Sequence, residues 1–323
     1  MLARQITRVA DGTDVIVNRE ASRLAPEGGL RRIIVDAAAA GRARVHETRS
    51  LADLEAVARD IAARGSSAVV LAGGDGSYMA GLSALARAHG DRALPPIALA
   101  PGGTVCTVAR NLGMKGSARD YARRIVRGVA EGTAHSEARP TLRVGDDRGG
   151  ERIGFIFGAG LVVRFFKEYY AAPRQGLGAA AQILARVFTG SLAGSSYAAR
   201  LLGPTHCSLH VGGKLHEARE WSLVLASVVR DVGLHLLVPY RAGEEFDRFH
   251  VVASGLSPRA LGAQLPRAFA GRALVGAPGI DALVPTLHID FDEEGAGYVL
   301  DGDLFHARSA KVEPGPLLSL LRV

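Results

Sequence analysis

The stretch Ala68–Leu82 constrains the fold more than any other, because it joins an apolar run of strand length to three glycines and one aspartate. It predicts a β-strand, a tight loop and a helix. Glycines that open a helix leave backbone N–H groups uncovered beside the helix's positive end, which suits phosphate. Asp75 stands apart, since a carboxylate repels a bare phosphate. Its presence favours a metal ligand or a proton acceptor, and a plain tight turn is the alternative.

Strands and helices alternate through the first 130 residues. Strands are expected at Asp14–Asn18, Ala43–Thr48 and Pro96–Ala100, and helices from Ser22, as N-cap, to about Ala40 and from Ser50 to Arg64. The second helix shows an apolar stripe of Leu51, Leu54, Val57, Ala58 and Ile61. A second glycine loop, Pro101–Arg110, follows the fourth strand. This alternation predicts an α/β domain with a mostly parallel sheet.

Polar and glycine residues fall where each predicted strand ends. They are Asn18, Thr48, the loop Gly73–Ser77 and the loop Gly102–Thr104. Because ligands bind at the carboxyl ends of parallel strands, these residues predict a nucleotide site. The first loop has neither the spacing of a P-loop nor that of a dinucleotide fingerprint, so another class of phosphate site is needed.

After a basic helix at Ser117–Val129 the sequence changes character. Arg119, Arg123 and Arg127 are spaced four apart there, and a solvated face is the simplest interpretation of them. A domain boundary is expected near Thr133, giving domains 1–133 and 134–313 and a tail 314–323 that is apolar enough to pack back onto one of the domains. The second domain is predicted as an antiparallel β-sandwich from short segments between Gly, Pro and Asp. These segments are Ala138–Val144, Arg152–Phe157, Tyr197–Leu202, His206–Val211, Lys214–Ala218 and Trp221–Ser227.

Two segments of the second domain look helical, Leu161–Tyr170 and Gly178–Phe188. They could line an acyl-chain pocket, lie on a membrane surface, or cover the sheets. His206 and His210 share a polar strand face with Ser208, for which a solvated face is favoured over a metal site.

Asp301-Gly302-Asp303 lies between two strand patterns. A hairpin turn explains it, and so does an acidic pair for metal binding and proton acceptance.

Composition narrows the class of partner. The 323-residue chain has a net charge of +7, which favours anionic partners, but no interleaving of aromatic and basic residues that would indicate nucleic acid. Two cysteines are too few for a disulfide framework. Residues 1–8 have no apolar core of signal-peptide length, and no membrane span is apparent. We expect a soluble cytoplasmic protein.

Together these motifs resemble the diacylglycerol kinase-like lipid kinases, a family that includes sphingosine and ceramide kinases. The family pattern has asparagine after the first strand, Gly-Gly-Asp-Gly-Thr, Pro-x-Gly-Thr-x-Asn-Asp-x-Ala-Arg, and a late Asp-Gly-Glu. This chain has Val17-Asn18, Gly73–Ser77, Pro101–Arg110 followed by Leu112-Gly113, and Asp301–Asp303 in the same order.

The resemblance implies an N-terminal nucleotide domain, a C-terminal lipid domain, and Mg-ATP bound in the cleft between them. By position, the ATP-binding residues would be Asn18, Thr48, Gly73, Gly74, Asp75, Gly76, Ser77, Tyr78, Met79, Gly103 and Thr104. Asp303 would accept the proton of the lipid hydroxyl, with Asp75 the less favoured acceptor and Asp301 beside it. Asp75 and Asp301 are the candidate Mg²⁺ ligands. The implied partners are a lipid substrate at a membrane surface and anionic phospholipid, reached by peripheral association.

The chain departs from the family pattern at several positions. Ser77 replaces threonine, Cys106 and Thr107 replace the Asn-Asp pair, and Asp303 replaces glutamate. Pro239–Phe246 matches the family's metal-holding acidic loop poorly, so no structural magnesium is assigned to it. The acceptor lipid is therefore open, with ceramide as defensible as diacylglycerol.

Two other functions are compatible with these residues. An NAD kinase shares the Gly-Gly-Asp-Gly element, although Ile153–Gly158 is a poor substitute for that enzyme's later glycine motif. The third possibility is a lipid- or nucleotide-binding protein that has lost turnover through the changes at Cys106, Thr107 and Asp303.

Overall fold

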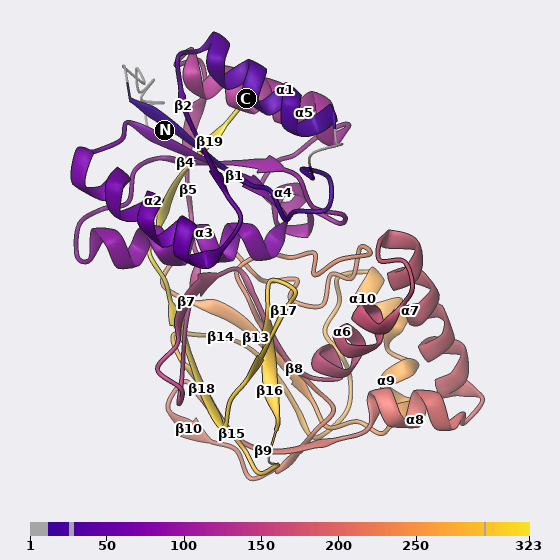
Figure 1. The fold of residues 1–323 in the computed structure, drawn as a ribbon. Helices are drawn as coiled ribbons and strands as arrows, with labels where there is room; N and C mark the ends of the chain where they lie inside the picture. The colour runs from indigo at the N-terminus through magenta and orange to yellow at the C-terminus, as the bar shows by residue number, and fades with distance from the viewer. Residues whose placement is uncertain (1–11, 26–28, 294) are drawn as a thin grey trace. The chain divides into compact units, whose positions relative to one another are not determined.

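Apolar runs of the N-terminal third form the central sheet of one compact unit (Figure 1). The computed structural model describes residues 12–25, 29–293 and 295–323, and the chain divides into residues 1–139 with 317–323 and residues 140–316. The sheet has the order β2-β1-β3-β4-β19-β5. Its strands are β1 (Thr13–Asn18), β2 (Arg44–Thr48), β3 (Ala68–Gly73), β4 (Ile97–Pro101), β5 (His135–Arg139) and β19 (Leu318–Arg322). Only β19 and β5 pair antiparallel, so the predicted α/β unit is confirmed.

Helices cover both faces of this sheet (Figure 1). They are α1 (Gly29–Ala40), α2 (Leu51–Arg64), α3 (Asp75–His89), α4 (Thr107–Asn111) and α5 (Ala118–Ala130). On the face of α1 and α5, Ile34 and Ile125 pack with Val15 and Val70 in one buried cluster. The arginines of α5 point to solvent while Tyr121 and Val129 are buried, as the spacing predicts.

Two details of the predicted helices need correction. Leu51 does not join the buried stripe of α2, because it lies in the exposed first turn, and its side chain is 70% exposed. Ser22 does not cap α1, which begins at Gly29. Its hydroxyl instead bonds the Thr104 hydroxyl at 2.8 Å, and residues 26–28 lie outside the described chain. Ser50, by contrast, caps α2 and accepts a hydrogen bond from the backbone N–H of Asp53.

The division of the chain departs from the boundaries expected near residues 133 and 313. Strand β5 pairs with β19, which keeps residues 135–139 in the first sheet and brings the C-terminal residues back to it. Pro140 separates β5 from the next strand, because proline supplies no backbone N–H to a ladder.

Asp14 is a buried carboxylate at the start of β1, and because of it we expect the free energy of unfolding to fall in acid. Burial by itself raises the pKa of Asp14, but hydrogen bonds from His46 and Arg44 outweigh it and hold the pKa far below 3.8. A lowered folded-state pKa stabilises the fold above the unfolded pKa, and this contribution is lost as pH falls below about 4. We expect Asp14→Asn to lower the free energy of unfolding by about 2 kcal/mol at pH 7 and by less at pH 3. Urea unfolding at both pH values measures this; an equal deficit at the two would contradict it.

The second unit contains two antiparallel sheets. One has the order β10-β9-β15-β18-β6-β7, with β11 also on β9, and the other has the order β14-β13-β12-β8-β16-β17. The first comprises β6 (Leu142–Asp146), β7 (Glu151–Gly154), β9 (Thr205–Val211), β10 (Lys214–Leu215), β11 (Glu220–Trp221), β15 (Leu287–Phe291) and β18 (Ser309–Pro314). The second comprises β8 (Ile156–Gly160), β12 (Leu223–Ser227), β13 (Phe249–Ser254), β14 (Gly279–Val284), β16 (Gly297–Leu300) and β17 (Asp303–His306). A β-rich C-terminal unit is thereby confirmed.

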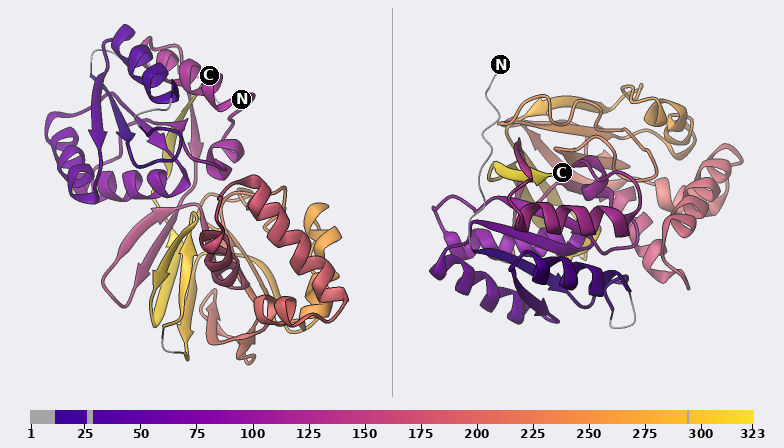
Figure 2. Two further views of the ribbon diagram at one scale, coloured as in Figure 1. Left: turned by 45° about the vertical axis from the view of Figure 1, so that its right-hand side comes forward. Right: turned by 90° about the horizontal axis from the view of Figure 1, so that it is seen from above.

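Helices gather on one side of the strands of this unit (Figures 1 and 2). They are α6 (Leu161–Ala171), α7 (Leu177–Leu192), α8 (Ser196–Leu202), α9 (Pro258–Gly262) and α10 (Leu265–Phe269). The two predicted helical segments are confirmed as α6 and α7, whereas the strand predicted at Tyr197–Leu202 is wrong. That segment forms α8, because Ser195 caps it and its alanines, leucines and arginine favour helix.

Two absences concern the described residues only. There, no helix is both long and apolar enough to cross a membrane, and no group of three or more His, Cys, Asp or Glu side chains could hold a metal ion. Residues 1–8, which carry the expectation about a signal peptide, lie outside the described chain.

Candidate functional site

The two glycine loops of the first unit touch each other through their backbones. The N–H groups of Gly102 and Gly103 both donate to the carbonyl oxygen of Gly73, at 2.6 and 3.1 Å. A Cβ atom built on Gly103 would lie 2.6 Å from the Cα of Gly74. The ends of β3 and β4 therefore meet at a point where a side chain on Gly103 has no room.

This close approach predicts a large effect of one methyl group. We expect Gly103→Ala to push the loops apart and to lower the free energy of unfolding by about 1–3 kcal/mol, with weaker nucleotide binding. Gly65→Ala is a control for backbone strain alone, because Gly65 has a φ of 80° and no atom within 4 Å of its built Cβ. Urea unfolding and ATP titration measure both variants. A Gly103→Ala protein that binds ATP like the wild type would contradict this account of the loops.

Asp75 joins the second loop to the first. It is the first residue of α3, and its carboxylate accepts the backbone N–H groups of Thr107 (2.8 Å) and Val108 (3.0 Å), the first residues of α4. A carboxylate at the N-terminus of a helix satisfies N–H groups that have no partner inside the helix. Asp75 lies in the first glycine loop, as the sequence predicts. Its two hydrogen bonds position the second loop against the first.

Cys106 stands where the resembled family has asparagine. Its φ of 56° is left-handed, a conformation that asparagine adopts more readily than most residues. The side chain is buried, and its Sγ donates to the carbonyl oxygen of Gly103 at 3.2 Å. Burial raises the pKa of the Cys106 thiol to about 11, so the thiol stays protonated and is no nucleophile near neutral pH.

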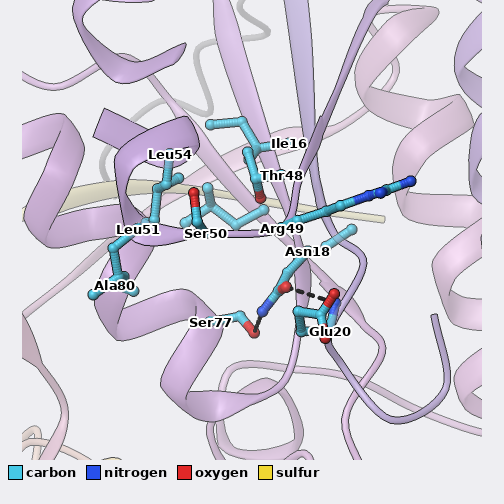
Figure 3. Close-up of a pocket in the computed structure, with 13 residues that line it drawn as sticks. Ile16, Asn18, Glu20, Thr48, Arg49, Ser50, Leu51, Leu54, Ser77 and Ala80 are labelled. Carbon is cyan, nitrogen blue, oxygen red and sulfur yellow. Dashed lines mark hydrogen bonds between the residues drawn. The ribbon is translucent and has the colours of Figure 1, made fainter. Parts of the chain in front are cut away.

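Asn18 and Ser77 connect β1 with the first turn of α3 (Figure 3). The amide Nδ2 of Asn18 donates to the Ser77 hydroxyl at 2.9 Å, and its Oδ1 accepts the backbone N–H of Glu20. The Ser77 hydroxyl also accepts the N–H of Gly74. Ser77 stands where the family has threonine, and its hydroxyl helps to hold the first glycine loop in place. Gly76 precedes it in the first turn of α3.

A pocket of about 180 Å³ opens at these strand ends, between the first turns of α2 and α3 (Figure 3). Its apolar wall comes from Ile16, Leu51, Leu54, Leu71, Ala72, Ala80 and Gly81, and its polar residues are Asn18, Glu20, Thr48, Arg49, Ser50 and Ser77. An apolar cavity with a few polar groups at one side is typical of a small-molecule site. The strand-end rule found Asn18, Thr48 and Ser77. It missed Glu20, which lies two residues after the end of β1, and Arg49, which directly follows β2.

The acidic turn of the second unit is a two-residue hairpin. Leu300 pairs with Asp303, while Asp301 and Gly302 have φ values of 49° and 97°, as a type I′ turn requires. The Asp301 carboxylate is buried and accepts the backbone N–H groups of Phe155 and Ile156, at 2.9–3.1 Å. Asp301 therefore fixes the hairpin to the start of β8.

Asp303 differs from Asp301 in having no such partner. No hydrogen bond or ion pair involves its carboxylate among the residues that the structure describes, and burial raises its pKa. The Tyr170 hydroxyl of α6 donates to the carbonyl oxygen of Gly302 at 2.9 Å, which attaches an aromatic helix to the same turn. A carboxylate with a raised pKa, on a turn that an aromatic helix contacts, is suited to accepting a proton.

The candidate residues thus form two sets. Asn18, Thr48, Gly73, Gly74, Asp75, Gly76, Ser77, Gly103 and Thr104 belong to the first unit, and Asp301 and Asp303 belong to the second. Each set lies at one end of the strands of its own unit.

Residues 13–137 match the model of the diacylglycerol kinase catalytic domain. The N-terminal unit is therefore similar to this catalytic domain. The matched range runs from the first residue of β1 into β5 and contains both glycine loops and the pocket. The resemblance inferred from the sequence is confirmed, and the match indicates a kinase.

Solved structures extend the likeness to both units. A diacylglycerol kinase from Bacillus anthracis str. Sterne is 16% identical, with a TM-score of 0.62 over 95% of this chain and 94% of that one. A second structure from that organism is 17% identical, with a TM-score of 0.66 over 94% and 93%. A yeast NADH kinase in complex with NADH reaches 0.48 at 12% identity, over 97% and 83%. No curated protein matches the chain. At such identities the likeness to the two Bacillus anthracis structures shows the fold, an N-terminal α/β domain followed by a β-rich domain.

Proposed function

We propose that this protein is an ATP-dependent lipid kinase, which transfers the γ-phosphoryl group of ATP to the hydroxyl of a membrane lipid. The lipid is a diacylglycerol or a sphingoid lipid such as ceramide. The observation that carries the proposal is Asp303, a carboxylate with a raised pKa on a hairpin bonded to an aromatic helix. The catalytic-domain match over residues 13–137 supplies the nucleotide half of the proposal.

ATP binds in the first unit. The nucleoside occupies the pocket beside Asn18 and Thr48, and the phosphates lie against the glycine loops, whose N–H groups and helix N-terminus attract negative charge. Mg²⁺ enters with ATP as part of the substrate. Asp75 and Asp301 were its candidate ligands, but both already accept backbone N–H groups, which fits them better to hold the loops than to hold a metal.

Asp303 accepts the proton of the lipid hydroxyl as that oxygen attacks the γ-phosphorus. Phosphoryl transfer needs little more from the protein than alignment, charge neutralisation and a destination for this proton. The reaction therefore requires both units, with ATP held by one and the acceptor hydroxyl met by Asp303 of the other.

The second unit offers the apolar surface that a lipid needs. Phe165, Phe166 and Val162 of α6 are only partly buried, and Tyr170 and Leu177 are about 40% exposed. We propose that α6 and α7 receive the acyl chains, that the two antiparallel sheets pack as a β-sandwich, and that the protein associates peripherally with anionic phospholipid. The exposed arginines of α5 suit such a surface.

The test is an assay with labelled ATP, MgCl₂ and mixed micelles that contain diacylglycerol, ceramide or sphingosine. We expect a labelled lipid from at least one of them. NAD in a parallel reaction distinguishes the competing kinase class: labelled NADP with no labelled lipid overturns the proposal. ATP binding without any labelled product overturns it in favour of a binding protein.

A further inference from the structure

The turn between β1 and α1 covers the second glycine loop. The backbone N–H of Arg23 donates to the carbonyl oxygen of Gly102 at 3.1 Å, and a guanidinium nitrogen of Arg23 donates to the carbonyl oxygen of Thr104 at 3.2 Å. The Ser22 and Thr104 hydroxyls lie 2.8 Å apart. Leu24 packs beneath, so close that a Cβ on Gly102 would meet its side chain at 2.4 Å. The turn thus holds the Arg23 guanidinium at the edge of the loop proposed to bind phosphate.

The Arg23 guanidinium is exposed and has no acidic partner within the described ranges. The neighbouring Arg19, in contrast, pairs with Glu47 at 3.5 Å. A guanidinium has five N–H donors, and the bond to Thr104 uses one of them. Its planar donors match phosphate oxygens, and no ion pair with a described carboxylate occupies them.

Other arginines also belong to this site, since Arg110 ends the second glycine loop and Arg49 lines the pocket. Neither glycine loop contains a lysine, unlike a P-loop. Asp75, the carboxylate of the first loop, is engaged with the N-terminus of α4. The charge of a triphosphate must be balanced for transfer to proceed, so a cation supplied by the chain itself is valuable here.

We infer that Arg23 binds the phosphate chain of the nucleotide at the Thr104 loop. The inference rests on the proposed nucleotide site but not on the identity of the acceptor. Arg23 would then contact the substrate directly, while Ser22 and Leu24 keep the turn closed over the loop.

Calorimetric titration of the full-length protein with adenosine, ADP and ATP in the presence of MgCl₂ tests this. We expect Arg23→Gln to weaken ATP binding about 10- to 100-fold and ADP binding less, with adenosine affinity unchanged. Arg23→Lys keeps the charge but loses the planar donors, so its ATP affinity should lie between those of Arg23→Gln and the wild type. Arg59→Gln is the matched control, since Arg59 is exposed on α2 and has no ion pair in the described chain.

The three ligands separate a phosphate contact from a structural one. If Arg23→Gln lowers the affinities for adenosine and ATP equally, Arg23 only holds the loop. If the ATP affinity is unchanged, Arg23 neither holds the loop nor contacts the phosphates. Either result overturns the inference. The lipid assay is independent of this result. A wild type that phosphorylates no lipid while Arg23→Gln loses ATP affinity refutes the lipid kinase and supports the phosphate contact.

Discussion

Asp303→Asn will lower the rate of lipid phosphorylation about 10²- to 10⁴-fold and leave ATP affinity unchanged. The amide has nearly the same shape as the carboxylate but cannot take up the proton of the attacking hydroxyl. Because the Asp303 carboxylate has no hydrogen-bond or ion-pair partner among the described residues, the change breaks no such interaction. The fold should therefore survive, and kcat should fall without a matching rise in KM for ATP.

The pH dependence provides a second measurement of the same residue. Burial raises the pKa of Asp303 above its ordinary value of 3.8, and the general base must be deprotonated to act. The wild-type kcat/KM should thus fall tenfold per pH unit as the pH drops below this raised pKa. The residual activity of Asp303→Asn should not show this fall at low pH.

A matched control for Asp303 is available in the same unit. Asp290 lies on β15 with its side chain 46% exposed and pairs with His288 at 3.0 Å. Asp290→Asn should keep full activity and an unchanged pH profile. The assignment of Asp303 fails if its variant retains wild-type kcat, or if both asparagine variants lose activity to the same extent.

Much of the first unit is predictable because β1, β3 and β4 are almost completely buried. Continuous apolar runs such as Val15–Val17 and Ala68–Ala72 have no other stable environment, and each ends at a polar or glycine residue. The position of Asn18 and of both glycine loops at one edge of the sheet follows from that pattern. The hairpin at Asp301 is predictable for a local reason, since Asp-Gly favours the positive φ angles of a type I′ turn.

Two of the incorrect predictions, for Ser22 and Leu51, involve contacts distant in sequence. Ser22 has the chemistry of an N-cap, but its hydroxyl meets Thr104, 82 residues away. Leu51 fits an apolar stripe by spacing, yet it lies at the mouth of a pocket instead of over the sheet. Tyr197–Leu202 is short and mainly apolar, which suggested a strand, but its residue types and the Ser195 cap favour the helix that forms. For Ser22 and Leu51 local patterns could not decide, because tertiary contacts outweigh a few tenths of a kcal/mol of intrinsic preference.

For Asp75, too, the sequence does not show which distant groups its side chain contacts. A carboxylate in a glycine loop suggested metal or proton chemistry, but both oxygens accept N–H groups of α4, more than 30 residues along the chain. This predicts that Asp75→Ala destabilises the protein by about 2–4 kcal/mol, because it leaves two backbone donors without their charged acceptor. Asp75→Asn retains one acceptor oxygen and should cost about half as much.

Urea unfolding of the free protein measures these losses, with Asp53→Ala as the control. Asp53 belongs to an exposed capping box within one turn of α2, so its removal should cost about 0.5–1 kcal/mol. Loss of these hydrogen bonds should also displace the second glycine loop. Nucleotide affinity should therefore fall more in Asp75→Ala than in Asp75→Asn. If Asp75→Ala unfolds at the wild-type urea concentration while phosphoryl transfer disappears, the carboxylate serves the chemistry directly. The joining of the two glycine loops would then rest on the backbone contacts of Gly73 and Gly74 with Gly102 and Gly103.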